Sequence, residues 1–142
     1  MKIGLVTGSD DLEKCFMVRR AVFMDEQGVT DEEEWDGLDK DCRHYLAQNA
    51  NGPTAVARAL PKGKAAKIQR VAVLKPNRGT GLGRQLMLAV LEDIRQEGFQ
   101  EAVLDSQSYA IPFYQRLGFV AKGPEFDDAG IPHRRMSLLF KD

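Results

Sequence analysis

Cysteines and long apolar runs are both scarce in this 142-residue sequence. Its two cysteines, Cys15 and Cys42, are too few for a disulfide framework and lack the CxxC spacing of zinc and redox sites. No apolar run approaches the roughly 18 residues of a membrane span, and the stretch from Ile3 to Val6 is too short for a signal-peptide core. We therefore expect a cytoplasmic protein that uses no membrane.

An excess of charge of one sign is also missing. Twenty Lys and Arg residues face 21 Asp and Glu residues, which gives a formal net charge of -1. This balance removes the sequence-wide attraction that drives nonspecific binding to nucleic acid, so we expect no nucleic-acid partner. The 43% hydrophobic and 29% charged content is that of an ordinary globular protein, and the length predicts a single domain over residues 1–142.

The periodicity of apolar residues predicts an α+β fold with a mixed, mostly antiparallel sheet. Asn51-Gly52 and the Pro61 to Lys64 stretch indicate two hairpins, and a helix beginning at Leu82 introduces one parallel neighbour. The expected strands are residues 2–7, 44–48, 54–59, 66–74, 102–104, 119–122 and 135–140. The expected helices are residues 9–23, 82–97 and 111–117. A Gly-, Pro- and Asp-rich connection is expected between the last two strands.

A glycine-rich loop, Arg78 to Arg84, lies between a predicted strand and the central helix. Glycines let the backbone approach a ligand closely, the helix N-terminus carries about half a positive charge, and Arg78 and Arg84 add two whole charges. Phosphate or pyrophosphate is the natural ligand of such a loop. In the simplest alternative, these glycines only form a tight turn.

Two nucleotide-binding motifs fit this loop less well. A P-loop ends in Gly-Lys-Ser/Thr, whereas Gly83 is followed by Arg84 and Gln85. A dinucleotide-binding fold would use Gly79 and Gly81, with Asp105 near the place of a ribose-binding acid, but Arg84 occupies the third glycine position. Too little chain follows Asp105 to complete a doubly wound sheet.

Two motifs resemble the GNAT family of acetyl-CoA-dependent N-acetyltransferases. The family signature Gln/Arg-x-x-Gly-x-Gly/Ala is matched by Arg78, Gly81 and Gly83, and its aromatic-Tyr…Gly-Phe marker is matched by Phe113 to Phe119. The segments 22–27 and 130–133 look like a subgroup of small GNAT proteins. The resemblance implies a three-layered α/β/α fold whose fourth and fifth strands splay apart to admit acetyl-CoA, and a homodimer is common among relatives.

The resemblance also assigns roles to particular residues. Backbone N–H groups of Val71, Ala72 and Val73 would hold the pantetheine arm and polarise the acetyl carbonyl. The residues that would hold the pyrophosphate are Arg78, Gly79, Thr80, Gly81, Leu82, Gly83 and Arg84. Tyr114 matches the family tyrosine that contacts the cofactor thiol and acts as general acid; a packing role is the alternative.

The general base is assigned less directly. His133 is the first choice because imidazole titrates near neutral pH and because it would lie where the last connection enters the final strand, although it is equally consistent with simple exposure. Glu26 is the second choice, since it follows apolar residues and could reach the acceptor cleft. His44 is expected to be structural.

The acidic segment from Asp31 to Asp36 could attract a cationic amine, with Trp35 stacking on it, or it could be a solvated loop. It also imitates half of a calcium loop, but Arg43 stands where a bidentate Glu is needed, so we expect no metal. The leading expectation is transfer of an acetyl group from acetyl-CoA to a primary amine of a small molecule or peptide. The rival is a noncatalytic acyl-CoA sensor or interaction module of the same fold.

Overall fold

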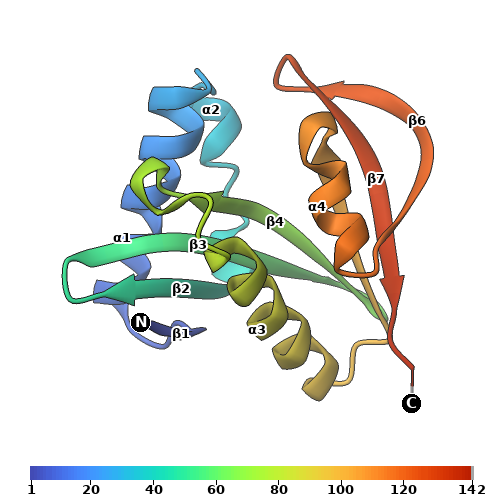
Figure 1. Cartoon of the computed structure of the whole chain (residues 1–142), viewed down its shortest axis with the longest axis horizontal. Coiled ribbons are helices and arrows are strands. Elements are labelled where there is room, and N and C mark those ends of the chain that lie inside the picture. The colour runs from blue at the N-terminus through green and yellow to red at the C-terminus, as the bar shows by residue number, and fades with distance from the viewer. Residues whose placement is uncertain (142) are drawn as a thin grey trace.

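The computed structural model describes residues 1–141 and contains one seven-stranded sheet with the order β1-β2-β3-β4-β5-β7-β6 (Figure 1). The strands are β1 (Lys2–Leu5), β2 (Arg43–Asn49), β3 (Gly52–Lys62), β4 (Ala65–Val73), β5 (Glu101–Gln107), β6 (Val120–Asp128) and β7 (Ile131–Leu139). The α-helices are α1 (Ser9–Arg19), α2 (Asp31–Glu34), α3 (Leu82–Gln96) and α4 (Ile111–Arg116). A π-helical segment, η1 (Arg20–Glu26), continues α1, and the 3-10 turns are η2 (Asp39–Asp41), η3 (Lys75–Asn77) and η4 (Ser108–Ala110).

Helices cover both faces of the sheet. On one face, α3 buries Leu86, Val90 and Ile94, whose i, i+4, i+8 spacing forms a single apolar stripe against the strands. On the opposite face, α1 packs Cys15 and Val18 against neighbouring strands. The α/β/α layering and the order of elements confirm the fold predicted from the sequence. No helix among residues 1–141 combines the length and apolar character of a membrane span.

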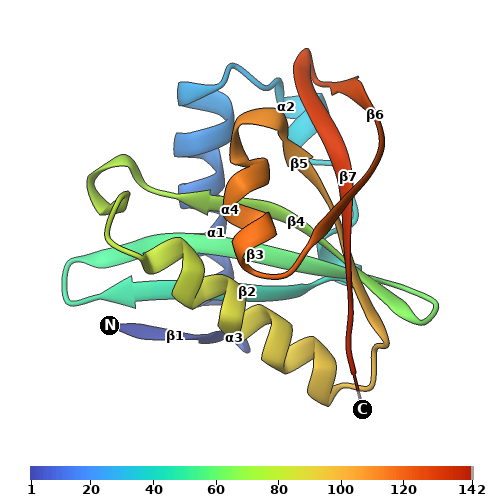
Figure 2. The same cartoon turned by 45° about the vertical axis from the view of Figure 1, so that its right-hand side comes forward.

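The sheet opens between β4 and β5, its only parallel pair. These strands pair only from Ala65 to Ile68 and from Glu101 to Leu104, although both continue beyond that point. Figures 1 and 2 show the two strands diverging from their common start. Because the strands are parallel, the gap lies at their carboxyl ends. The splayed pair expected from the family resemblance is therefore present.

A bulge in β4 lies at the beginning of this gap. Arg58 of β3 pairs with Gln69, but Val56 pairs with Ala72, so β4 contains one extra residue at this point. A one-residue slip reverses the face to which each side chain points. Ile68 accordingly packs in the core cluster under α3, whereas Ala72 packs in the cluster under α1.

The C-terminal part of the fold corrects one expectation. In place of two short strands and a long connection, β6 and β7 form one long hairpin that turns at Ala129-Gly130. A bulge between Lys122 and Phe126 absorbs the Gly-Pro-Glu stretch. Proline is tolerated there because β6 is an edge strand. As a consequence, His133 lies inside β7 rather than at the end of a loop.

Candidate active site

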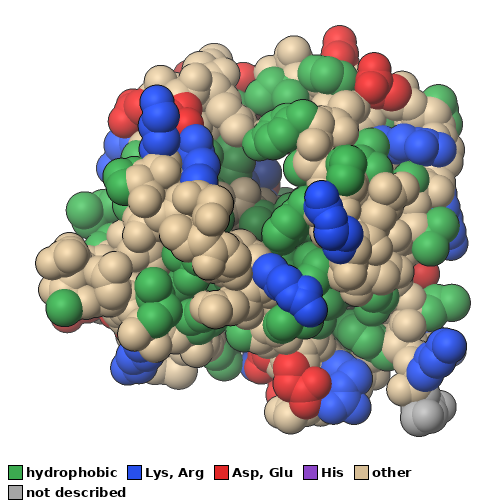
Figure 3. Space-filling model, in the orientation of Figure 1, with side chains coloured by type: hydrophobic (Ala, Val, Ile, Leu, Met, Phe, Trp, Pro, Cys, Tyr) green, Lys and Arg blue, Asp and Glu red, His purple; other side chains and the backbone are tan. Residues whose placement is uncertain are grey.

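A cavity of about 960 Å³ occupies the gap between β4 and β5. The space-filling view shows a hollow with apolar side chains around it and basic side chains beside it (Figure 3). Every residue predicted to bind the cofactor lines this cavity except Thr80. Glu26, Tyr114 and His133 line it as well, so the three candidate catalytic residues lie around one space.

The glycine loop forms one end of the cavity. Gly79 and Gly81 have φ values of 76° and 83°, which side chains disfavour, and Gly81 is the N-cap of α3. The first-turn N–H groups of α3 have no carbonyl partner within the helix, so they and the positive end of its dipole are available to an anion. Thr80 is exposed and does not line the cavity; its hydroxyl donates to the Asn77 carbonyl at 2.8 Å.

Arg78 links this loop to two other elements. Its Nη2 donates to Glu26 Oε1 at 2.7 Å, and its Nε donates to the Val73 carbonyl at 2.9 Å. The hydrogen bond from Arg78 lowers the pKa of Glu26, whose side chain is partly exposed. Glu26 therefore lies at the glycine-loop end of the cavity as a paired carboxylate, which is a poor proton acceptor.

The backbone of β4 faces the gap directly after the bulge. The Leu74 N–H donates to Thr54 of β3 at 2.8 Å, whereas the Val73 carbonyl accepts from Arg78. Since polar backbone groups of successive strand residues point in opposite directions, those of Val73 and Val71 point away from β3. The unpaired edge of β4 thus presents these N–H groups to the cavity.

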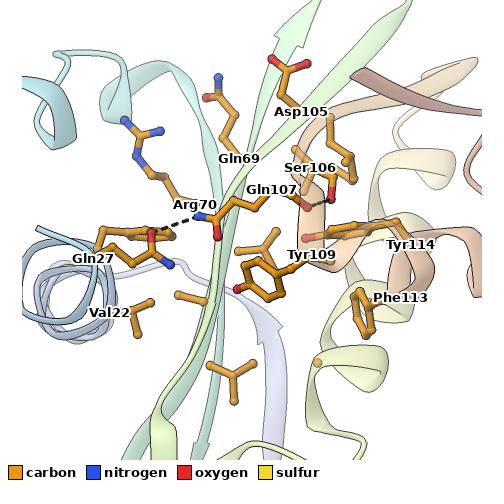
Figure 4. A pocket seen from close by; sticks show the side chains of 18 of the residues that line it. Val22, Gln27, Gln69, Arg70, Asp105, Ser106, Gln107, Tyr109, Phe113 and Tyr114 are labelled. Carbon is orange, nitrogen blue, oxygen red and sulfur yellow. Dashed lines mark hydrogen bonds between the residues drawn. The ribbon is translucent and has the colours of Figure 1, made fainter. Parts of the chain in front are cut away.

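Tyr114 lines the cavity, and its hydroxyl points toward the other lining side chains, as Figure 4 shows. Its ring is 8% exposed and makes edge-to-face contacts with Phe113 and Phe119, at centroid distances of 5.0 and 5.9 Å. The hydroxyl has no hydrogen-bond partner among residues 1–141, and burial raises the pKa of Tyr114. The residue therefore both packs in the core and presents a proton on the cavity wall.

His133 is the third residue of β7, close to the turn of the hairpin, and it pairs with Gln107 of β5 and Phe126 of β6, with 9% of its surface exposed. Its Nδ1 is 2.7 Å from the Ile131 carbonyl, and its ring stacks on Phe126. A carbonyl only accepts, so Nδ1 carries the proton and the neutral ring keeps its lone pair on Nε2. This nitrogen has no partner within the described part of the chain.

Several residues that line the cavity were not predicted from the sequence. Gln107 Nε2 donates to Gln27 Oε1 at 3.0 Å, so one hydrogen bond crosses the opening between β5 and the end of η1 (Figure 4). Tyr109, which is 79% exposed, adds a second phenol close to Tyr114. The only sequence signal for these residues was their position just after a predicted strand or inside the 22–27 segment.

The acidic segment is more ordered than a solvated loop. Thr30 and Glu33 form a reciprocal capping box at the start of α2, and Glu34 is 1% exposed. Trp35 stacks under Arg19 and Arg20, at 4.9 and 5.5 Å from its ring centroid, so its face is used within the chain. No group of three or more potential metal ligands occurs within residues 1–141.

Comparison with known proteins identifies the class. Residues 16–140 match the acetyltransferase (GNAT) domain family. The uncharacterized N-acetyltransferase YjcF of Bacillus subtilis is 35% identical over 137 residues, which are 96% of this chain and 98% of that protein. The chain therefore belongs to the GNAT family, whose members transfer acetyl groups.

Solved structures give the same fold. An acyl-CoA N-acyltransferase from Pseudomonas aeruginosa superposes with a TM-score of 0.87 at 27% identity, covering 96% of this chain and 99% of that one. A Bacillus subtilis acetyltransferase in complex with CoA has a TM-score of 0.74 over 99% of both chains. At 18% identity the latter supports the fold alone.

Proposed function

We propose that this protein transfers the acetyl group of acetyl-CoA to a primary amine of a small molecule or peptide by direct attack of the amine. The observation that carries the proposal is a single cavity into which four features open. These are the N-terminus of α3, the unpaired edge of β4, Tyr114 and His133. They satisfy the needs of acyl transfer for anion binding, carbonyl polarisation, an acid and a base.

The residues present fit coenzyme A at the glycine loop. Arg84, the remaining donors of Arg78 and the first-turn N–H groups of α3 would hold the pyrophosphate. A Cβ at Gly83 would lie 3.5 Å from Phe113 and 3.7 Å from Val73, which is ordinary van der Waals contact, so the first turn of α3 packs against both of these residues. When bound, acetyl-CoA supplies the activated thioester.

In the proposed reaction, groups on different walls of the cavity have different roles. Backbone N–H groups of Val71 and Val73 donate to the acetyl oxygen as negative charge develops on it. His133 Nε2 accepts a proton from the amine, either directly or through water, and Tyr114 donates its proton to the departing sulfur. His133 is preferred to Glu26 as the base because the Glu26 carboxylate is already paired with Arg78.

The raised pKa values of the two cysteine thiols disfavour a mechanism that passes through a covalent acetyl-enzyme. Burial raises the pKa of Cys15 to about 12, and burial also raises the pKa of Cys42. Neither cysteine lines the cavity. Because the thiolate is the nucleophile, both cysteines would react poorly at neutral pH.

The test combines calorimetry of CoA binding with thiol release from acetyl-CoA over a panel of polyamines, amino acids, peptides and other amines. We expect binding in the micromolar range, turnover with at least one amine, and a loss of at least tenfold in kcat for His133→Gln with CoA affinity retained. Arg78→Glu should weaken CoA binding, whereas Arg95→Glu at the far end of α3 should not. Binding without release for every amine would favour a sensor, and absence of binding would refute the proposal.

A further inference from the structure

Six charged side chains beside the cavity form a closed ring in which arginine and carboxylate alternate. In order around the ring, they are Arg19, Glu34, Arg70, Asp36, Arg58 and Asp39. The six nitrogen-to-oxygen distances, in the same order and closing back to the first residue, are 2.8, 3.1, 3.5, 2.6, 2.8 and 2.6 Å. This charged ring connects α1, the α2 segment, β3 and β4.

Half of the charged ring is buried. The exposed fractions of Arg19, Arg58 and Glu34 are 1% each, so their charges depend on one another rather than on water. Although partial burial by itself would raise the pKa of Asp36, the bonds and charge of Arg58 outweigh it and lower that pKa to about 2. Arg58 also donates to Gln69 Oε1 of β4 at 2.9 and 3.1 Å. These ion pairs and hydrogen bonds therefore hold the side chains of the charged ring in fixed positions.

Arg70 is the member of the charged ring that lies at the bulge of β4, and it lines the cavity. Its φ is 56°, a left-handed value that within residues 1–141 is otherwise found only at glycines and at Ala129 in the β6–β7 turn. Its Nε donates to Glu34 Oε2 at 3.1 Å, and its Nη2 donates to the carbonyls of Glu33 and Glu34 at 3.2 Å. The guanidinium is turned away from Tyr114 (Figure 4).

The conformation of Arg70 decides which backbone groups face the gap. The extra residue at the bulge shifts the alternation of β4, so Val71 and Val73 present their N–H groups to the cavity and Ala72 faces β3. Without the bulge this pattern would be reversed, because polar backbone groups alternate along a strand. A residue with a side chain disfavours the left-handed conformation unless its surroundings enforce it.

We propose that Arg70 is a positioning residue, held in the left-handed conformation by the charged ring so that β4 directs the N–H groups of Val71 and Val73 to the thioester. The chemical consequence rests on the proposed function, whereas the structural part does not. The charged ring thereby connects the α2 segment, which borders the cavity, to the strand that polarises the acetyl group. Arg70 touches neither reacting atom and acts through the backbone that follows it.

Two substitutions at residue 70 separate the effect of losing the arginine side chain from the effect of losing the left-handed backbone conformation. Arg70→Ala removes the ring contacts and leaves a residue that disfavours positive φ, whereas Arg70→Gly removes the same contacts but adopts positive φ readily. Arg95→Ala, which breaks the exposed 2.8 Å pair with Glu92 on α3, is the matched control. Measurements are NMR couplings and chemical shifts that report φ at residue 70, CoA affinity, and kcat.

We expect Arg70→Ala to lose the positive-φ signature and at least tenfold in kcat, with CoA affinity changed less than threefold. Arg70→Gly should keep the signature and lose less than threefold in kcat, and the control should match wild type. The proposal would be overturned if Arg70→Ala kept both the positive-φ signature and the wild-type kcat. It would also be overturned if Arg70→Ala and Arg70→Gly lost kcat equally. If no amine supports turnover, the NMR signature still decides the structural part.

A milder variant covers the case in which Arg70→Ala fails to fold. Asp36→Asn removes one carboxylate, 26% exposed, from the charged ring while keeping Arg70 and its bonds to Glu34. We expect partial loss of the positive-φ signature and a two- to fivefold loss in kcat. Wild-type values for both would contradict a role of the ring.

Discussion

In the proposed mechanism, Tyr114 is a core residue whose hydroxyl also takes part in the chemistry. Its ring is held by Phe113 and Phe119, so the position of the oxygen is fixed by packing rather than by a hydrogen bond. A phenol whose pKa is raised by burial stays protonated at neutral pH and has a proton to donate to a departing thiolate. At the scale of a residue, packing and the proposed proton donation thus depend on the same ring.

Tyr114→Phe tests this assignment with little effect on the fold, since the hydroxyl makes no hydrogen bond within residues 1–141. We expect kcat to fall at least tenfold, CoA affinity to change less than twofold, and the melting temperature to stay within a few degrees. Steady-state kinetics, calorimetry of CoA binding and thermal unfolding measure these quantities. Tyr109→Phe is the comparison: if it lowers kcat and Tyr114→Phe does not, Tyr109 is the acid instead.

At the scale of an element, the two ends of α3 offer a matched pair of glycines. Gly81 at its start and Gly98 just past its end have φ values of 83° and 97°, and a Cβ at either position would meet nothing within 4 Å. An alanine at either site should therefore cost a similar amount, about 1 kcal/mol of stability, through backbone strain alone. Only Gly81 lies in the cavity wall.

We predict that Gly81→Ala weakens CoA binding about tenfold because it shifts the first turn of α3 and misaligns the N–H groups aimed at the pyrophosphate. Gly98→Ala should leave that affinity unchanged while lowering the melting temperature by a similar amount. Calorimetric titration and thermal unfolding of both variants provide the measurement. Equal affinity losses would mean that the effect is general destabilisation and not anion binding.

At the scale of the whole molecule, stability should depend on carboxylates held by arginines in different elements. The pKa of Asp36 is lowered to about 2, and that of Asp39 is also lowered, because hydrogen bonds from Arg58 and Arg19 outweigh the effect of burial. Asp in an unfolded chain titrates near 3.9. As pH falls, the unfolded state therefore binds protons first, and the stability from these groups is lost between about pH 4 and pH 2.

We expect the free energy of unfolding to fall over this range by about 1 kcal/mol for each of Asp36 and Asp39 after solvent screening. Asp36→Asn should make the free energy of unfolding depend less steeply on pH. Asp25→Asn, which removes an exposed carboxylate outside the charged ring, should leave this dependence unchanged. Denaturant titrations at pH 5, 4, 3 and 2.5 measure this dependence. A flat profile in the wild-type protein would show that the ring contributes little to stability.

Much of this architecture was predictable from local signals. The stripe of Leu86, Val90 and Ile94 and the Gly98 stop predicted α3, and the Asn51-Gly52 turn predicted a hairpin. The loop from Arg78 to Arg84 was expected before the central helix, where it lines one end of the cavity. The β6–β7 hairpin was not predictable, because Gly123 and Pro124 interrupt the alternation and only pairing with β7 carries the strand past them. The first helix also differs from the prediction of residues 9–23, because α1 ends at Arg19 and the π-helical η1 continues it to Glu26.

Short-range patterns in the chain determined the secondary elements, the glycine loop and the family, since periodicity and turn chemistry act over a few residues. Tertiary structure alone decided that residues from α1 to β4 would form a closed ring of charges and that Arg70 would adopt a left-handed conformation. Tertiary structure also brought Gln27, Tyr114 and His133 around one cavity. These features depend on contacts between distant segments, whose alignment is fixed only when the sheet and its covering helices pack together.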